Sequence, residues 1–162
     1  MDYFAVSYYS FRPLADPLKL VATYQHFLES IGAKGRIYLS EEGINAQLSI
    51  EKRQQQVFCD WVHQLFPKNI PTIKWQAAKE HAFFKLTVKY RTQLCAFDVP
   101  VAIENCGERL SAQQWQQILE NRPANTYILD VRNQYESAVG HFEWAITPNV
   151  ANFRDFPRYT EK

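Results

Sequence analysis

The sequence has few cysteines, no long apolar run and almost no net charge. Its three cysteines, Cys59, Cys95 and Cys106, include no CxxC pair, which argues against a disulfide framework and a zinc site and favours a reducing compartment. No apolar run approaches the roughly 20 residues that span a bilayer, and the start MDYFAVSYYSF lacks the basic and apolar regions of a signal peptide. We therefore expect a cytoplasmic protein with no membrane partner.

What is present is material for a packed core. Hydrophobic residues make up 46% of the 162 residues and charged residues 22%, a globular composition. The length suffices for one domain plus part of another. The net charge of +1 conceals an asymmetry, since residues 1–95 carry 12 Lys and Arg against 8 Asp and Glu, whereas residues 96–162 carry 6 against 9. The first part is therefore basic and the second acidic.

The first 95 residues predict alternating strands and helices. An N-cap at Asp16 with Pro17 behind it begins the first helix, and Gly32 ends it. The predicted elements are a strand over 2–11, a helix over 17–31, a hairpin of 34–39 and 44–50, a helix over 51–66, and one or two strands within 72–94. This βαββαβ order predicts an α+β, ferredoxin-like domain, with two helices on one face of an antiparallel sheet.

A second, shorter unit follows. Residues 96–110 break the periodicity and predict a linker. Ser111 is an N-cap candidate for a helix over 112–119, and residues 127–132 predict a strand that ends in charge, as a parallel strand does at the carboxyl edge of an α/β sheet.

The segment DVRNQYE over 130–136, followed by GHFEWA over 140–145, resembles the signature that opens rhodanese-like domains. It departs from that signature at Phe142 and Trp144. The resemblance implies that residues 111–162 are an incomplete α/β rhodanese-like domain. We expect the motif residues to be structural rather than catalytic: a charge-assisted network that fixes a turn and a hydrogen-bonded turn histidine. They are Asp130, Arg132, Glu136, Gly140 and His141.

The segment GRIYLSEEGINAQLS over 35–49 closely resembles a motif of the rhodanese-related tRNA uridine hydroxylases. The resemblance implies the N-terminal part of a bacterial enzyme that forms 5-hydroxyuridine at the tRNA wobble position, with molecular oxygen as co-substrate and a rhodanese-type cysteine. None of the three cysteines is the first residue of a C-x-x-G-x-R motif. We therefore assign no catalytic residue to this chain and expect the nucleophile beyond Lys162. No metal site and no other cofactor is evident. The chain is interpreted as a fragment that is inactive by itself.

The open face of such a sheet is where related topologies bind single-stranded RNA. We expect it to contact the anticodon arm of tRNA, with Lys and Arg on phosphates and Tyr on a base. The candidates are Arg36, Tyr38, Asn45, Lys85, Lys89 and Arg91. Alternatively, Arg36 and Asn45 brace the hairpin.

Three other functions remain open. The chain could be a binding or scaffold module with a rhodanese remnant, or part of a rhodanese sulfurtransferase with another acceptor. An acyl-phosphate hydrolase would use Arg12 near the first strand–helix junction. Against the hydrolase, the lead-in SYYSF has no glycine for a phosphate cradle, and Leu39 stands where that family needs an asparagine.

Overall fold

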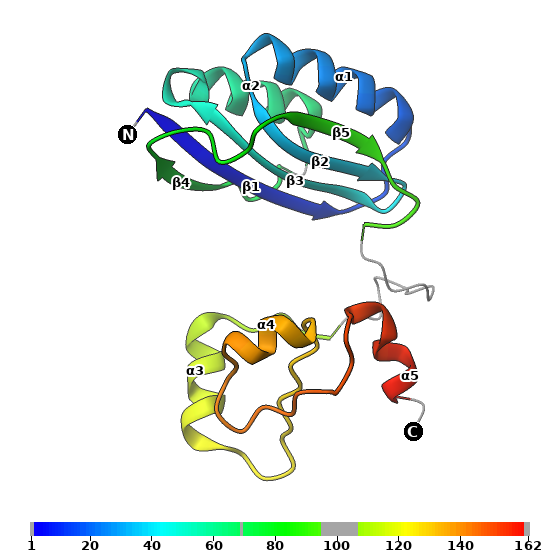
Figure 1. Cartoon of the computed structure of the whole chain (residues 1–162), viewed down its shortest axis with the longest axis vertical. Coiled ribbons are helices and arrows are strands. Elements are labelled where there is room, and N and C mark those ends of the chain that lie inside the picture. The colour runs from blue at the N-terminus through cyan, green and yellow to red at the C-terminus, as the bar shows by residue number, and fades with distance from the viewer. Residues whose placement is uncertain (1, 69, 95–106, 161–162) are drawn as a thin grey trace. The chain divides into compact units, whose positions relative to one another are not determined.

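The computed structural model describes residues 2–68, 70–94 and 107–160. The chain forms two compact units, residues 1–95 and 96–162 (Figure 1). Cys95, Cys106 and the part of the predicted linker over 96–106 lie outside the described residues.

The first unit is a five-stranded sheet with two main helices. Its elements are β1 (Tyr3–Phe11), α1 (Pro17–Ser30), β2 (Lys34–Ser40), β3 (Gly43–Glu51), the 3₁₀ turn η1 (Lys52–Gln54), α2 (Gln55–Leu65), β4 (Lys74–Ala78) and β5 (Leu86–Tyr90). The predicted start of α1 is confirmed, because the Asp16 carboxylate accepts a hydrogen bond of 2.9 Å from the Lys19 backbone N–H. Gly32, at φ +67°, provides the left-handed residue after the helix.

The strand order is β4-β1-β3-β2-β5. The first four strands are antiparallel to their neighbours, but β5 pairs with β2 in parallel. The α+β class is confirmed, whereas the expectation of an antiparallel sheet is wrong at this edge. The cause is residues 79–85, which cross the sheet from β4 at one edge to β5 at the other (Figure 1). We call them the crossing segment.

Two glycines let the strands of this unit approach closely. A Cβ on Gly43, whose φ is +142°, would lie 1.9 Å from the Ser10 carbonyl oxygen. A Cβ on Gly35 would lie 2.4 Å from the Gln47 carbonyl oxygen. Both glycines belong to the motif over 35–49, so these positions of the motif are required by backbone geometry.

Helices α1 and α2 cover one face of the sheet (Figure 1). Alternate strand residues point into the core beneath them, including the fully buried Ile37, Leu39, Ile44 and Leu48. The ring of Trp61 stacks on that of Phe27 at 4.0 Å between centroids. The residues that alternate with the buried ones lie on the opposite face, which we call the helix-free face.

The second unit contains α3 (Ala112–Asn121), α4 (Gln134–Val139), η3 (Phe153–Asp155) and α5 (Phe156–Thr160). The Ser111 N-cap is confirmed by a capping box with Gln114. The predicted strand over 127–132 is wrong, since Leu129 forms only an isolated parallel bridge with Ile146. A strand needs a continuous neighbour, and within residues 107–160 this bridge is the only strand-like pairing.

In the ranges that the structure describes, no helix is both long enough and apolar enough to cross a membrane.

Candidate nucleic-acid interface

The six RNA-contact candidates lie on the helix-free face of the first unit. On β2, Ile37 and Leu39 are fully buried, so Arg36 and Tyr38 point to the other side. Tyr38 pairs in register with Asn45 on β3 and with Lys89 on β5. Lys85, four residues before Lys89, and Arg91, two residues after it, continue the same face at the two ends of β5 because alternate residues share a face. Residues from three strands and their flanks are therefore brought together.

Tyr38 is covered on one side by a cation. The guanidinium carbon of Arg91 lies 5.0 Å from the centre of the Tyr38 ring, a cation–π distance. The Arg91 backbone N–H donates a hydrogen bond of 2.8 Å to the Leu39 carbonyl, which extends the β2–β5 pairing. Arg91 and Tyr38 thus form one unit with a charged and an aromatic part.

Asn45 lies between two tyrosines, because it pairs in register with Tyr9 on β1 as well as with Tyr38. Tyr9 is 47% exposed and was not among the sequence candidates, although the alternation in β1 could have found it. Neither the Asn45 amide nor the Arg36 guanidinium has a hydrogen bond or ion pair with another described residue. The alternative that these two side chains brace the hairpin therefore gains no support.

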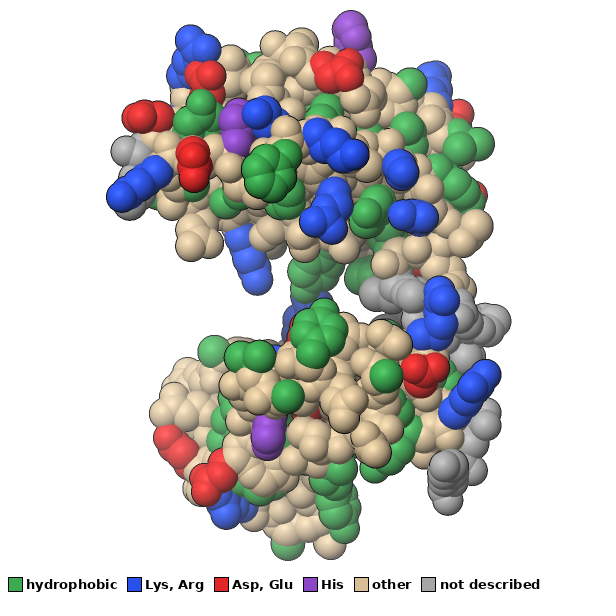
Figure 2. All heavy atoms as spheres, in the orientation of Figure 1, with side chains coloured by type: hydrophobic (Ala, Val, Ile, Leu, Met, Phe, Trp, Pro, Cys, Tyr) green, Lys and Arg blue, Asp and Glu red, His purple; other side chains and the backbone are tan. Residues whose placement is uncertain are grey.

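Further basic residues share this face. Lys34 precedes Arg36 by two residues on β2 and so lies on the same face. Lys74 on β4 pairs in register with Ser7 on β1, which also lies on this face. Glu51, an acid on the same side, forms an ion pair with Arg53. Figure 2 shows Lys and Arg side chains gathered on the visible side of this unit. The face is therefore suited to a polyanion.

The crossing segment covers part of the helix-free face. The Ser49 hydroxyl accepts a hydrogen bond of 3.2 Å from the Ala82 backbone N–H and lies 2.9 Å from Nδ1 of His81. The His81 ring also lies 4.5 Å from the Tyr3 ring. Ser49 is consequently fully buried although it is on the face without helices. Burial lowers the pKa of His81, which favours a neutral ring that can accept the Ser49 proton at Nδ1.

The two glutamates of the hairpin turn hold the end of β5. The Tyr90 hydroxyl donates to the Glu41 carboxylate at 2.8 Å, and the Leu94 backbone N–H donates to Glu42 at 3.0 Å. The hydrogen bond to Glu41 raises the pKa of Tyr90. These motif acids therefore position β5, and with it Lys89 and Arg91.

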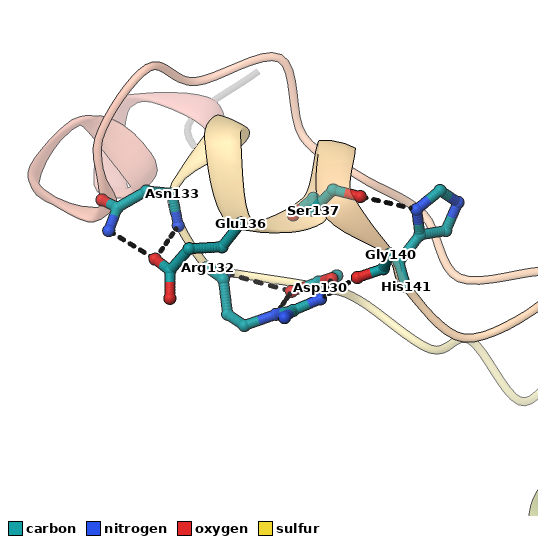
Figure 3. A network of polar contacts seen from close by, with 7 residues as sticks. All are labelled: Asp130, Arg132, Asn133, Glu136, Ser137, Gly140 and His141. Atoms are coloured by element: carbon teal, nitrogen blue, oxygen red, sulfur yellow. Dashed lines mark hydrogen bonds and ion pairs between the residues drawn. The ribbon is translucent and has the colours of Figure 1, made fainter.

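In the second unit, Arg132 organises a turn (Figure 3). Its Nε and a terminal nitrogen donate to the Asp130 carboxylate at 2.9 and 2.6 Å, and the same terminal nitrogen donates to the Gly140 carbonyl at 2.6 Å. These bonds lower the pKa of Asp130 to about 2. Nδ1 of His141 donates to the Ser137 carbonyl at 2.9 Å, since a carbonyl oxygen can only accept.

Glu136 does not join this network as the motif suggested. Its carboxylate accepts from the Asn133 backbone N–H at 3.2 Å and from the Asn133 amide at 2.6 Å. The Asn133 amide oxygen accepts in turn from the Phe153 backbone N–H at 3.0 Å. At the third position of α4, a carboxylate is nearest to the free N–H groups at the start of its own helix. The predicted single network is therefore two networks.

Comparison with known proteins assigns the first unit to a family. Residues 3–94 match the model of a family described as the UPF0176 acylphosphatase like domain. The chain belongs to this UPF0176 family. Over 99% of its length it is 36% identical to a protein of Chlamydia muridarum named tRNA uridine(34) hydroxylase, and 37% and 36% identical to proteins of that name from Chlamydia pneumoniae and Protochlamydia amoebophila.

The chain spans about half the length of these curated relatives, with 48%, 49% and 50% covered. Among solved structures, 55% of the chain is similar to full-length HypF in its phosphate- and nucleotide-bound form, at 13% identity. The TM-score of 0.33 is too low to carry an argument.

The acylphosphatase likeness of the UPF0176 domain does not extend to a hydrolytic site at Arg12. Leu39 is fully buried in the core, so position 39 offers neither a side-chain amide nor access to solvent. Arg12 is exposed and borders a shallow hollow of about 220 Å³ with Ser10 and Lys68. A catalytic pair of arginine and asparagine is therefore not assembled there.

Cys59 of the UPF0176 domain lies half-buried on α2. Burial raises the pKa of its thiol, which disfavours the nucleophilic thiolate. Within the described residues, no three His, Cys, Asp or Glu side chains lie close enough to hold a metal ion.

Proposed function

We propose that this chain is the N-terminal part of a cytoplasmic tRNA-modifying enzyme that hydroxylates the wobble uridine at C5, with molecular oxygen as co-substrate. The helix-free face of its UPF0176 domain binds the anticodon arm. The second unit is the opening part of a rhodanese-like domain, and the catalytic cysteine lies on a part of the protein outside this chain. The relatives' shared name, tRNA uridine(34) hydroxylase, supports the reaction and substrate.

The observation that carries the RNA-binding role is the placement of all six candidates on one face. Four positively charged side chains contact phosphate groups, and the Tyr38 and Asn45 side chains lie among them. The four are Arg36, Lys85, Lys89 and Arg91. Phosphate contacts position the RNA without reading its sequence. In this role the domain holds the anticodon arm, and the reacting groups act on the uridine that it presents.

The test is the salt dependence of binding. The full chain is titrated onto a fluorescent anticodon stem–loop RNA between about 50 and 200 mM KCl, a range in which counterion release gives a large change. Each phosphate contact adds about 0.7 to 0.9 to the slope of log K against log salt. The variant Arg36→Ala/Lys89→Ala should therefore lower the slope by about 1.5.

The matched control is Lys19→Ala, which removes an exposed lysine from α1 on the covered side of the sheet. It should leave the slope unchanged. If the chain fails to bind at 50 mM KCl, or if Lys19→Ala and the double variant weaken binding equally, the proposed RNA-binding role is wrong and a scaffold role is favoured.

A further inference from the structure

A hollow of about 530 Å³ lies on the helix-free face, at strands β4, β1 and β3 and beside the crossing segment. Its origin is a difference in side-chain length. Ser7 on β1 lies in register between Gln47 on β3 and Lys74 on β4, and Ala5 pairs with Gln76. Two short side chains therefore form a floor that longer ones surround. The volume is within the range of about 300 to 1,000 Å³ that holds small ligands.

The walls of the hollow carry unused hydrogen-bonding groups. Gln47 and Gln76 are exposed, and neither amide, nor the Ser7 hydroxyl, bonds to another side chain in the described part of the molecule. Each amide offers two N–H donors and an oxygen acceptor, and the hydroxyl can donate and accept. Such groups match the mixed donor and acceptor edge of a nucleobase.

An aromatic ring and a cation complete the hollow. Phe83, which is half-buried, lines it from the crossing segment, and Lys74 lies exposed at its edge. The bonds of Ser49 to Ala82 and His81 fix the crossing segment next to Phe83. A base can stack on such a ring while its phosphate meets the lysine.

We infer that this hollow is a subsite for one unstacked nucleobase of single-stranded RNA. Gln47, Gln76 and Ser7 bond the edge of the base, Phe83 contacts its ring face and Lys74 its phosphate. This inference rests on the proposed function, because the hollow adds recognition of a base to a face otherwise suited to phosphates.

The experiment measures binding of the full chain to an anticodon stem–loop in which each loop nucleotide in turn is made abasic. At constant salt, one abasic position should weaken binding by about 5- to 140-fold, the range of a single base–aromatic contact. Gln47→Met/Gln76→Met keeps side-chain length and removes both amides, and Phe83→Ala removes the ring. Each variant removes one of the two kinds of contact, so each should discriminate between the intact and the abasic RNA less strongly than the wild type.

Phe84→Ala is the matched control, because Phe84 adjoins Phe83 but is fully exposed and outside the hollow. It should retain the discrimination of wild type. The inference is overturned if no abasic position weakens wild-type binding, or if the two hollow variants discriminate as strongly as the wild type. Salt-sensitive binding with no base dependence would refute the hollow alone, whereas no binding at low salt would refute the proposed function as well.

Discussion

Replacing Gly35 by alanine tests whether the motif glycine serves the fold. The new Cβ would lie 2.4 Å from the Gln47 carbonyl oxygen and 2.5 Å from the Leu48 Cα. Both are backbone atoms of β3, so β2 and β3 must separate by about 1 Å to reach ordinary contact. Overpacking costs about 1 to 3 kcal/mol, and each weakened ladder hydrogen bond adds about 1 kcal/mol. We expect a loss of about 3 to 4 kcal/mol from a domain whose total is about 5 to 15 kcal/mol.

The assay is urea unfolding followed by the amide NMR signals of β3, which report on the first unit alone. The matched control is Gly32→Ala, where the new Cβ meets nothing within 4 Å and the penalty is the left-handed φ of +67°, about 1 to 2 kcal/mol. If Gly35→Ala costs less than Gly32→Ala, the close approach of the strands does not explain the motif glycine.

Three further predictions concern buried or paired polar groups. The hydroxyl of Tyr8 donates to that of Tyr24 at 3.2 Å in the core, so Tyr24→Phe should lower the free energy of unfolding by about 1 to 3 kcal/mol. In urea unfolding, Tyr8→Phe/Tyr24→Phe should lose less than the sum of the two single variants. Additive losses would contradict the pairing. NMR titration should give Asp130 a pKa of about 2, and this pKa should rise toward the ordinary value in Arg132→Gln. The ionised carboxylate stabilises the second unit at pH values above its unfolded pKa, and this stability is lost as the pH drops toward 2. An unchanged pKa in Arg132→Gln would contradict the pairing. Burial lowers the pKa of His81, whose neighbouring charges are Lys34 and Glu51. The stability of the first unit should therefore fall as the pH drops below about 6.5, where the unfolded histidine takes up a proton. His81→Gln should remove that part of the pH dependence, and an unaltered pH dependence would show that His81 is not its source.

The elements that sequence reasoning placed correctly depend on local signals. Asp16 and Gly32 mark the limits of α1 through caps that involve only neighbouring residues, and the alternation in β2 and β3 separates the core side chains from Arg36 and Tyr38. The same alternation in Leu86–Tyr90 identifies a strand without saying which neighbour it takes. Its parallel pairing with β2 follows from the path of the crossing segment, which is a tertiary feature.

The candidate site shows the same division. The sequence offered six basic, aromatic and polar residues on the hairpin and the last strand as candidates, but their common face follows from the strand register. The contact between Arg91 and Tyr38 likewise joins residues far apart in the chain. Ser49 alternates with the core residues as an exposed residue would, and only the crossing segment buries it. Likewise, Glu136 bonds to the start of its own helix rather than to Arg132, because the free donors nearest to its carboxylate in the folded chain are those of Asn133.

The central claim is that the helix-free face of the UPF0176 domain binds the anticodon arm. The most direct measurement is the amide NMR spectrum of the isotope-labelled full chain as an anticodon stem–loop RNA is added. The account predicts that the largest shifts fall on Arg36, Tyr38 and Lys89, while the exposed residues of α1 and α2 stay unchanged. Shifts concentrated on those helices, or none at saturating RNA, would contradict it.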